Sequence, residues 1–164
     1  MKGIKKRFAK LKMISKVLQF EENSESTITG KEGDVAMAID GEADCTTLTT
    51  DCTIADKGGK IEIEYAESEI TGMEGATTKV VFDKKDTGLV SILREGSVST
   101  ALVFEEGKRH LCMYETPYFP IEMCINTITL ENHLSYEGGK MVAEYLVEMN
   151  GILAEKTHIT LTIL

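Results

Sequence analysis

Arg94 has the clearest capacity for chemistry in this sequence. It ends a predicted strand on the same face as Val90 and Ile92. A guanidinium on an inward face needs a carboxylate or a bound anion beside it. Glu67 and Glu115 are the candidate carboxylates. Three interpretations stay open: a pocket for an anion or a carboxylate, a buried ion pair that closes one end of the fold, and an exposed Arg beside a turn.

Two tyrosines complete the predicted ligand-binding site. Tyr65 lies two residues before Glu67 and Tyr114 directly precedes Glu115, and a tyrosine offers a binding site both an apolar ring and a polar hydroxyl. The predicted site therefore contains Arg94, Glu67, Tyr65, Tyr114 and Glu115. The same carboxylates and tyrosines would also suit a hydrolase-like enzyme. We assign no catalytic residue, and we expect a protein that is not an enzyme.

The sequence patterns for metal binding, nucleophilic catalysis and phosphate binding are weaker. His110 and Cys112 share one face of a predicted strand, but two ligand types without a paired motif usually pack in a core, so we predict no metal site and no cofactor. There is no G-x-S-x-G nucleophile motif, and the segment 72–75 has Glu74 where a phosphate-binding loop needs Lys. The four cysteines form no C-x-x-C pair, which indicates reduced thiols and a cytoplasmic protein.

Short strands must position these residues, because apolar and polar side chains alternate along most of the chain. The clearest strand is 61–65, and a hairpin is predicted from 97–105 to 109–114 across the turn at Gly107. The segment 141–149 also fits a helical face, but the glycine pairs around it favour a strand. Eight to ten short strands without crossover helices predict an all-β fold, an antiparallel meander closed as a barrel or stacked as a sandwich.

Charge is divided unevenly along the 164 residues. Residues 1–20 hold seven of the 18 Lys and Arg residues and none of the 27 Asp and Glu residues, which leaves a net charge of −16 on the rest. Ile4, Phe8, Leu11 and Leu18 fall near one helical face, which predicts a basic amphipathic helix that could lie on an anionic membrane or an RNA backbone.

Three other interpretations of the basic segment stay open: packing on the acidic body of the chain, an unpacked tail, and a true start at Met13. Residues 21–33 are predicted to be a polar linker. The predicted organisation is a basic extension and linker over 1–33, followed by a β-barrel domain over 34–164. The acidic barrel is expected not to bind nucleic acid, because it repels phosphate. No apolar run is long enough for a membrane span.

Several short motifs carry a resemblance to a known family. They are Tyr65-Ala66-Glu67, Thr71-Gly72-Met73-Glu74-Gly75, Thr77-Thr78, Arg94-Glu95-Gly96-Ser97, Phe104-Glu105-Glu106-Gly107-Lys108 and Tyr114-Glu115-Thr116-Pro117. In order and spacing they resemble the YwiB-like family, small bacterial proteins grouped as a domain of unknown function. The resemblance implies an up-and-down, calycin-like barrel similar to lipocalins and implies no activity.

Three functions are therefore compatible with the sequence. The first is a barrel that binds a small amphipathic or anionic ligand with Arg94 at its polar end. The second is an interaction module with a filled barrel that works through its surface or its basic N-terminal segment, and exposed edge strands make a homodimer plausible. The third is the hydrolase-like enzyme. A small barrel can be filled by side chains or can hold one ligand, so the fold class does not choose among these functions.

Overall fold

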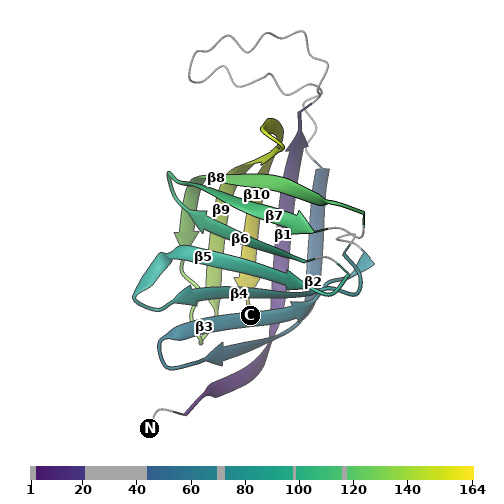
Figure 1. Cartoon of the computed structure of the whole chain (residues 1–164). Helices are drawn as coiled ribbons and strands as arrows, with labels where there is room; N and C mark the ends of the chain where they lie inside the picture. The colour runs from purple at the N-terminus through teal and green to yellow at the C-terminus, as the bar shows by residue number, and fades with distance from the viewer. Residues whose placement is uncertain (1–2, 21–43, 70–72, 98, 116–117) are drawn as a thin grey trace.

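The chain forms ten strands in one antiparallel sheet (Figure 1). The structure, a computed structural model, describes residues 3–20, 44–69, 73–97, 99–115 and 118–164. The strands are β1 (Lys5–Gln19), β2 (Asp44–Asp56), β3 (Lys60–Ala66), β4 (Thr77–Asp83), β5 (Asp86–Glu95), β6 (Thr100–Glu105), β7 (Arg109–Glu115), β8 (Pro120–Asn132), β9 (Gly139–Met149) and β10 (Ile152–Ile163). This confirms the all-β prediction, including the strand over 141–149.

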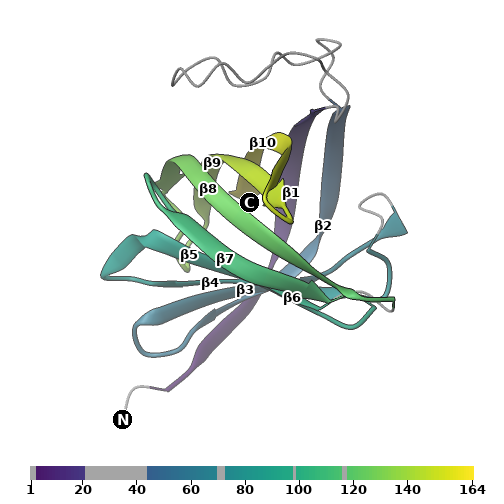
Figure 2. The same ribbon diagram turned by 45° about the horizontal axis from the view of Figure 1, so that its top comes forward.

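The strands wind up and down around a common interior, as Figures 1 and 2 show. Their order in the sheet is β6-β5-β4-β3-β2-β1-β10-β9-β8-β7, so only β6 and β7 are edges. These two edges lie side by side and meet through one isolated bridge between Ser99 and Glu115. The fold is therefore a nearly closed ten-stranded barrel, which leaves little unpaired strand edge among the described residues.

The predicted hairpin of β6 and β7 forms only in part. Its turn is present, because the Lys108 amide donates to the Glu105 carbonyl, but no ladder joins the two strands. The turn is held by β8 instead: the Gly107 amide donates to the Thr127 carbonyl, and the Thr127 amide donates to the Lys108 carbonyl. A register shift in β8 between Thr127 and Thr129 accompanies this contact. Bonds to β8 at the turn thus replace pairing along the hairpin.

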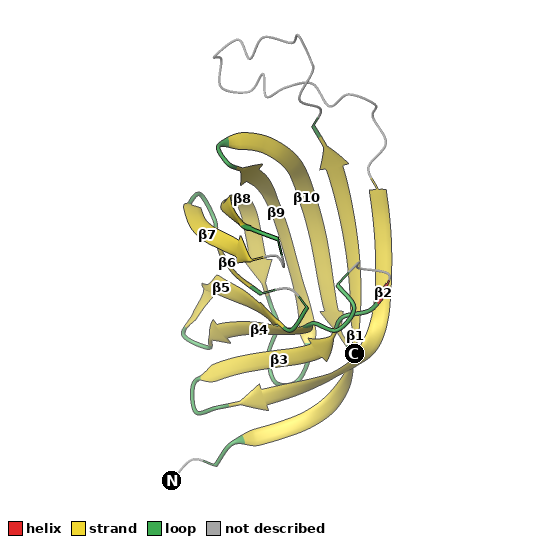
Figure 3. Ribbon diagram, turned by 45° about the vertical axis from the view of Figure 1, so that its right-hand side comes forward, coloured by secondary structure: helices red, strands yellow, loops and turns green. Residues whose placement is uncertain are grey.

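The predicted N-terminal helix is wrong. Residues 5–19 form β1, which pairs with β2 on one side and with β10 on the other, and no described residue belongs to an α-helix (Figure 3). The sequence fits a strand as well as a helix, since Leu11 and Met13 face inward and Lys10 and Lys12 face outward. Pairing on both edges satisfies the backbone of β1, and this tertiary context decides between the two periodicities.

The core fills the barrel between the strands with aliphatic and aromatic side chains. Two rows run across β3, β4, β5 and β6 in direct register and are buried throughout. The first row is Ile63, Val80, Ile92 and Leu102, and the second is Ile61, Phe82, Val90 and Phe104. Phe104 of the second row also meets Tyr145 of β9 edge-to-face, with ring centroids 4.8 Å apart, so this aromatic pair packs inside the barrel where β6 approaches β8 and β9.

Two predictions about the N-terminal part depend on residues that lie partly outside this description. The predicted linker over 21–33 falls outside the described residues, and the division of the chain into 1–33 and 34–164 stays a prediction. Among the residues that are described, no helix is long and apolar enough to cross a membrane.

Candidate functional site

A row of polar side chains crosses the same four strands, β3 to β6, two residues along each strand from the first apolar row. Tyr65 of β3 lies opposite Thr78 of β4, Thr78 lies opposite Arg94 of β5, and Arg94 lies opposite Thr100 of β6. All four side chains share the inward face, because each lies two residues from a member of the first apolar row. We call the barrel end that carries this row the polar end; the β3–β4 and β5–β6 connections lie there, at the right of Figure 1.

Glu67 is the partner of Arg94. The Glu67 side chain is fully buried just after β3, and one of its carboxylate oxygens lies 3.8 Å from Arg94 Nε, whose side chain is 16% exposed. The same oxygen accepts a 2.5 Å hydrogen bond from the Thr78 hydroxyl. The sequence predicted Glu67 as one of two possible partners for Arg94, and the structure brings these two residues together. A buried carboxylate beside a guanidinium is expected, since a buried charge needs a counter-charge.

Two glycines position this ion pair. Gly96 follows β5 directly with a φ of +125°, and a Cβ atom there would lie 2.3 Å from the Gly75 carbonyl oxygen. Only glycine permits both the backbone conformation and this close approach. The approach brings the β3–β4 connection onto the end of β5, and the Glu67 amide donates to the Ala76 carbonyl in that connection. The packing of the two connections therefore places Glu67 beside Arg94.

Two buried tyrosines stand near the ion pair. Burial, and then the neighbouring Glu67 carboxylate, raise the pKa of the Tyr65 hydroxyl far above its ordinary value. That hydroxyl lies 3.9 Å from the Met13 sulfur in β1. Burial also raises the pKa of Tyr145, while the nearby positive charge of Arg94 lowers it. Both phenols therefore stay neutral at physiological pH and can donate hydrogen bonds into the barrel.

Unpaired polar atoms collect at the polar end. Three buried side-chain atoms, Arg94 Nε, Thr100 Oγ1 and Thr157 Oγ1, lack a well-formed hydrogen bond among the described residues. The Thr100 hydroxyl has the Cys112 thiol beside it, and the Thr157 hydroxyl has the Tyr145 hydroxyl beside it. Thr100 lies directly opposite Arg94, and Thr157 of β10 lies directly opposite Tyr145. Buried donors and acceptors in native proteins nearly always have partners, so an unpaired group calls for water, an ion or a ligand.

The remaining predicted site residues divide between the two faces of β7. Tyr114 is half-buried and packs against the core. Glu115 is exposed on the opposite face, and its amide donates to the Ser99 carbonyl at the β6–β7 bridge. The structure therefore brings together Arg94, Glu67 and Tyr65, places Tyr114 on the inner wall, and leaves Glu115 outside.

Sequence reasoning missed Thr78, Thr100, Tyr145 and Thr157. Threonine and tyrosine are common in strands, so none of these residues stands out by type. The available signal was the alternation of inward and outward side chains along each strand. Thr78 lies two residues before the inward Val80, and Thr100 lies two residues before the inward Leu102. Tyr145 and Thr157 have no such signal toward Arg94, because strands far apart in sequence bring them there.

Glu155 is a second inward carboxyl group near this end. It lies opposite Val147 in the β9–β10 ladder, and burial raises the pKa of its carboxyl group above the ordinary value. It also lines a depression of about 490 Å³ with Gln19, Phe20 and the β9–β10 turn. A carboxyl with a raised pKa beside an opening is one mark of an enzyme. The described residues of this lining include no nucleophile and no second acid or base.

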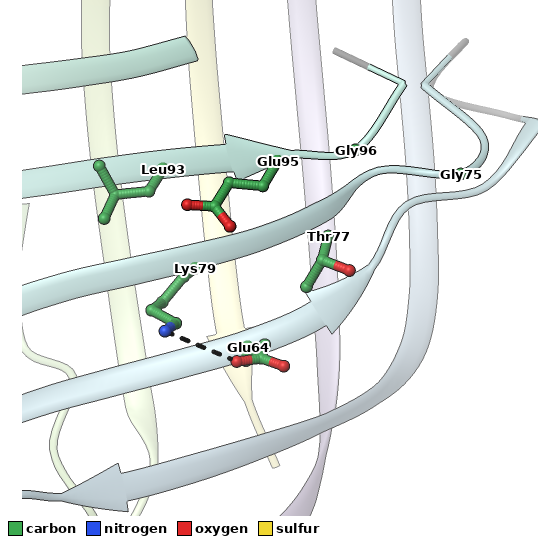
Figure 4. Close-up of a pocket in the computed structure, with 7 residues that line it drawn as sticks. All are labelled: Glu64, Gly75, Thr77, Lys79, Leu93, Glu95 and Gly96. Atoms are coloured by element: carbon green, nitrogen blue, oxygen red, sulfur yellow. Dashed lines mark ion pairs between the residues drawn. The ribbon is translucent and has the colours of Figure 1, made fainter. Parts of the chain in front are cut away.

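Two further depressions lie on the outside of the barrel. One, of about 470 Å³, covers the outer face of β3, β4 and β5, where Lys79 Nζ lies 3.8 Å from Glu64 (Figure 4). Its lining side chains alternate with Thr78 and Arg94, so it faces away from the ion pair. The other, of about 550 Å³, lies at the opposite end of the barrel between the start of β1 and two turns. Lys84 there pairs with Asp56, and both depressions are open surface features.

Histidine, cysteine and carboxylate side chains do not gather into a candidate metal site. Among the described residues, no three of them are placed so that they could hold a metal ion. His110 lies 3.2 Å from Glu105 as a pair, and Cys112 is half-buried on the same strand.

Fold and site together define a class: a nearly closed, up-and-down antiparallel β-barrel with an ion pair and unpaired polar atoms inside one end. The chain belongs to the family described as "Domain of unknown function (DUF1934)", whose model matches residues 34–161. This confirms the YwiB-like family expected from the sequence.

A solved structure shares the architecture. The crystal structure of the ywiB protein from Bacillus subtilis is similar to this chain with a TM-score of 0.61 and 16% sequence identity. The similarity covers 94% of this chain and 92% of that one. At this identity the likeness supports the fold alone. No protein of curated function matches the chain.

Proposed function

We propose that the protein binds a small anionic ligand inside the polar end of the barrel. The observation that carries the proposal is the unpaired Arg94 Nε beside Glu67, with the Thr100 hydroxyl directly opposite Arg94 and the Thr157 hydroxyl opposite Tyr145. An oxyanion would accept hydrogen bonds from the guanidinium and from both hydroxyls, and these bonds would be charge-assisted. Buried tyrosine hydroxyls at Tyr65 and Tyr145 supply further neutral donors.

The Arg94–Glu67 geometry leaves capacity for such a ligand. A separation of 3.8 Å between Nε and the carboxylate is longer than a charge-assisted hydrogen bond. Glu67 receives the short bond from Thr78. Arg94 Nε makes no hydrogen bond with a described residue, so this nitrogen keeps its donor for another acceptor. Glu67 would then limit the charge of the occupied site, because it neutralises part of the guanidinium. This arrangement favours a ligand with one or two negative charges.

The packing below the site limits the size of the ligand. Fully buried side chains of Val80, Val90 and Phe104 occupy the apolar rows, and the Phe104 ring contacts Tyr145 of β9. A long acyl chain would have to displace this core. A compact carboxylate or phosphate compound needs only the polar end. The proposal therefore retains a calycin-like barrel with one internal ligand and narrows that ligand to a small anion.

The first test is native mass spectrometry of the protein purified from a bacterial host, followed by denaturing extraction of any bound compound. A reproducible small anion is expected on the wild-type protein. If nothing co-purifies, thermal unfolding with inorganic phosphate and with succinate probes the site directly. A ligand at about 100 times its Kd stabilises the folded state by about 2.7 kcal/mol. A clean apo mass together with an unchanged Tm in both anions would refute the proposal.

Threonine variants separate a ligand site from a structural ion pair. Thr100→Val and Thr157→Val each remove an unpaired hydroxyl while keeping the side-chain shape. Without a bound partner these variants should be as stable as wild type or more stable, because an unpaired buried hydroxyl costs stability. With a ligand they should lose its retention. Thr160→Val on β10, on the opposite face from Thr157, is the matched control. Equal ligand retention in all three variants would contradict the site.

A second candidate function is an interaction module. Leu111 and Met113 are exposed on the outer face of the edge strand β7, where their exposed fractions are 72% and 51%. Exposed apolar side chains on an edge strand are a usual feature of a protein–protein contact. A homodimer through this strand and a cytoplasmic location both stay predictions.

The test of this second function is the mass of the protein in solution. Light scattering after size-exclusion chromatography should show a dimer that Leu111→Ser with Met113→Ser converts to monomer. A monomeric wild type at high concentration would argue against self-association through β7. Neither result bears on the ligand site, because Leu111 and Met113 face away from it.

A further inference from the structure

The outer face of β1 carries a row of lysines that the ligand site does not use. Lys6, Lys10, Lys12 and Lys16 are all exposed and lie at even positions of one strand. At about 3.3 Å per residue, Lys6 and Lys16 are about 33 Å apart. Figures 1 and 3 show β1 running the length of the barrel between β2 and β10. We call these four lysines the basic track.

Most of the positive charge on the track is uncompensated. Lys10 pairs with Asp51 of β2, whereas Lys6, Lys12 and Lys16 form no ion pair with any described residue. Several lysines elsewhere have local counter-charges, as in the pairs of Lys57 and Lys79 with Glu62. A linear array of free cations attracts an anionic partner at long range.

Hydroxyl groups border the track on both sides. Lys12 lies between Thr49 of β2 and Thr162 of β10, and the next outward position lies between Thr47 and Thr160. Threonine hydroxyls and lysine ammonium groups are common donors to the phosphates of nucleic acids. The track therefore offers donors in a band three strands wide.

An aromatic ring stands on the same line. Phe8 is 84% exposed between Lys6 and Lys10, which leaves nearly all of its ring available to a partner. Proteins that bind single-stranded nucleic acid combine a cationic path for the backbone with aromatic rings on which bases stack. Lysines, flanking hydroxyls and an exposed ring along one strand match this combination.

We propose that the outer face of β1 binds single-stranded nucleic acid. The expectation that the acidic barrel repels nucleic acid assumed that the basic segment lay apart from the barrel. Instead β1 is part of the barrel wall, and its lysines form a narrow band beside acidic neighbours. Glu144 of β9 lies beyond the flanking strand β10, and Asp51 of the other flanking strand, β2, lies opposite Lys10. A flat anionic membrane would meet these carboxylates, whereas a single strand can follow the lysines between them.

The test is fluorescence anisotropy of a labelled oligouridylate of about 12 nucleotides with the full chain, in about 50 mM and about 200 mM salt. Wild type should bind and weaken as salt rises. Lys12→Gln with Lys16→Gln should weaken binding at least about fivefold and lower the slope of log K against log salt by about 1.4, since each phosphate contact on a single strand contributes about 0.7.

Phe8→Ala should weaken binding by about 5- to 100-fold through lost base stacking while leaving the salt slope unchanged. The matched control is Lys60→Gln with Lys108→Gln, which removes two exposed charges outside β1 and should stay within about twofold of wild type. Circular dichroism checks that all variants keep the fold.

Four outcomes would overturn the proposal. They are an absence of binding at about 50 mM salt, an equal loss in the control pair, tighter binding to vesicles of phosphatidylserine and phosphatidylcholine than to the oligonucleotide, and a dimer that the Lys12 and Lys16 changes dissociate. The vesicle result would assign the track to a membrane, and the dimer result would assign it to a second copy of the chain.

Discussion

The apolar rows and the polar row of the barrel interior lie on the same four strands. They differ in whether all of their side chains have packing or hydrogen-bond partners within the chain. Ile63, Val80, Ile92 and Leu102 are buried against one another. Moving two residues along each strand gives Tyr65, Thr78, Arg94 and Thr100, where two of the four side chains hold unpaired polar atoms. Complete packing stabilises the fold, and the unpaired atoms one step away cost stability.

Under the proposed function, this difference would separate stability from ligand binding along the barrel axis. The apolar rows need no partner outside the chain, because apolar burial is satisfied by shape alone. The polar row is complete only when something donates to it or accepts from it. Substitutions in the two regions should therefore differ in size and in their response to bound anions.

The largest effect is expected at the ion pair. Arg94→Leu leaves the buried Glu67 carboxylate without its cation and should cost about 3–5 kcal/mol in the free energy of unfolding, measured with urea. The double variant Arg94→Leu with Glu67→Gln should recover a large part of this cost, because it removes the stranded charge. A single variant with wild-type stability would show that the pair contributes nothing and that the guanidinium is solvated.

In the apolar rows, Leu102→Ala should cost about 2–5 kcal/mol, since it leaves a cavity where the side chain is 5% exposed. Unlike the polar-row variants, it should lose no affinity for phosphate or for a co-purified anion. Ala101→Ser, on the exposed face of the same strand, is the control and should change the Tm little. An undisturbed urea curve for Leu102→Ala would contradict the inward assignment of β6.

Thr78→Val tests the bond that holds Glu67 in place. Loss of a hydrogen bond to a buried charged group should cost about 1.5–3 kcal/mol. If Thr78 also keeps Glu67 from closing onto Arg94, the variant should bind anions less tightly, which calorimetry with the co-purified anion measures. Thr77→Val on the exposed face of β4 is the matched control. A neutral outcome for both stability and binding would show that Glu67 needs no support from Thr78.

The smallest effect is expected at Glu155, and its size depends on pH. Burial raises its pKa in the folded state, so the folded state favours the protonated carboxyl, and stability falls as pH rises through that value. Glu155→Gln should therefore raise the Tm at neutral pH, with the gain shrinking as the pH is lowered toward about 4. A constant gain from pH 4 to pH 7 would mean that ionisation of Glu155 does not cause the effect.

Much of the fold was predictable from alternation, whereas the complete site was not. The strand 61–65 and the Arg94–Glu67 pair followed from local parity and from the cost of a buried charge. Glu115 was predicted for the site although it directly follows the inward Tyr114, and strict alternation along β7 places it outside. Alternation of side chains along β7 could therefore have excluded Glu115 from the predicted site.

The N-terminal strand and the far side of the site required tertiary information. In β1 the lysines fit both periodicities, and only the ladders to β2 and β10 select the strand. Tyr145 comes near Arg94 because strands remote in sequence close around one interior. Sequence patterns report which face a residue occupies and leave open which residues share a level of the barrel.

The pairing of β1 with β10 has a consequence for how the barrel assembles. Leu11 lies opposite Ile163, and nine residue pairs join the two strands. In a nascent chain, this edge of β1 therefore stays unpaired until β10 has been synthesised. The contact between β1 and β10 closes one of the longest loops in the molecule. High contact order slows folding, so the open edge is the point at which a chaperone or a neighbouring nascent chain would capture the intermediate.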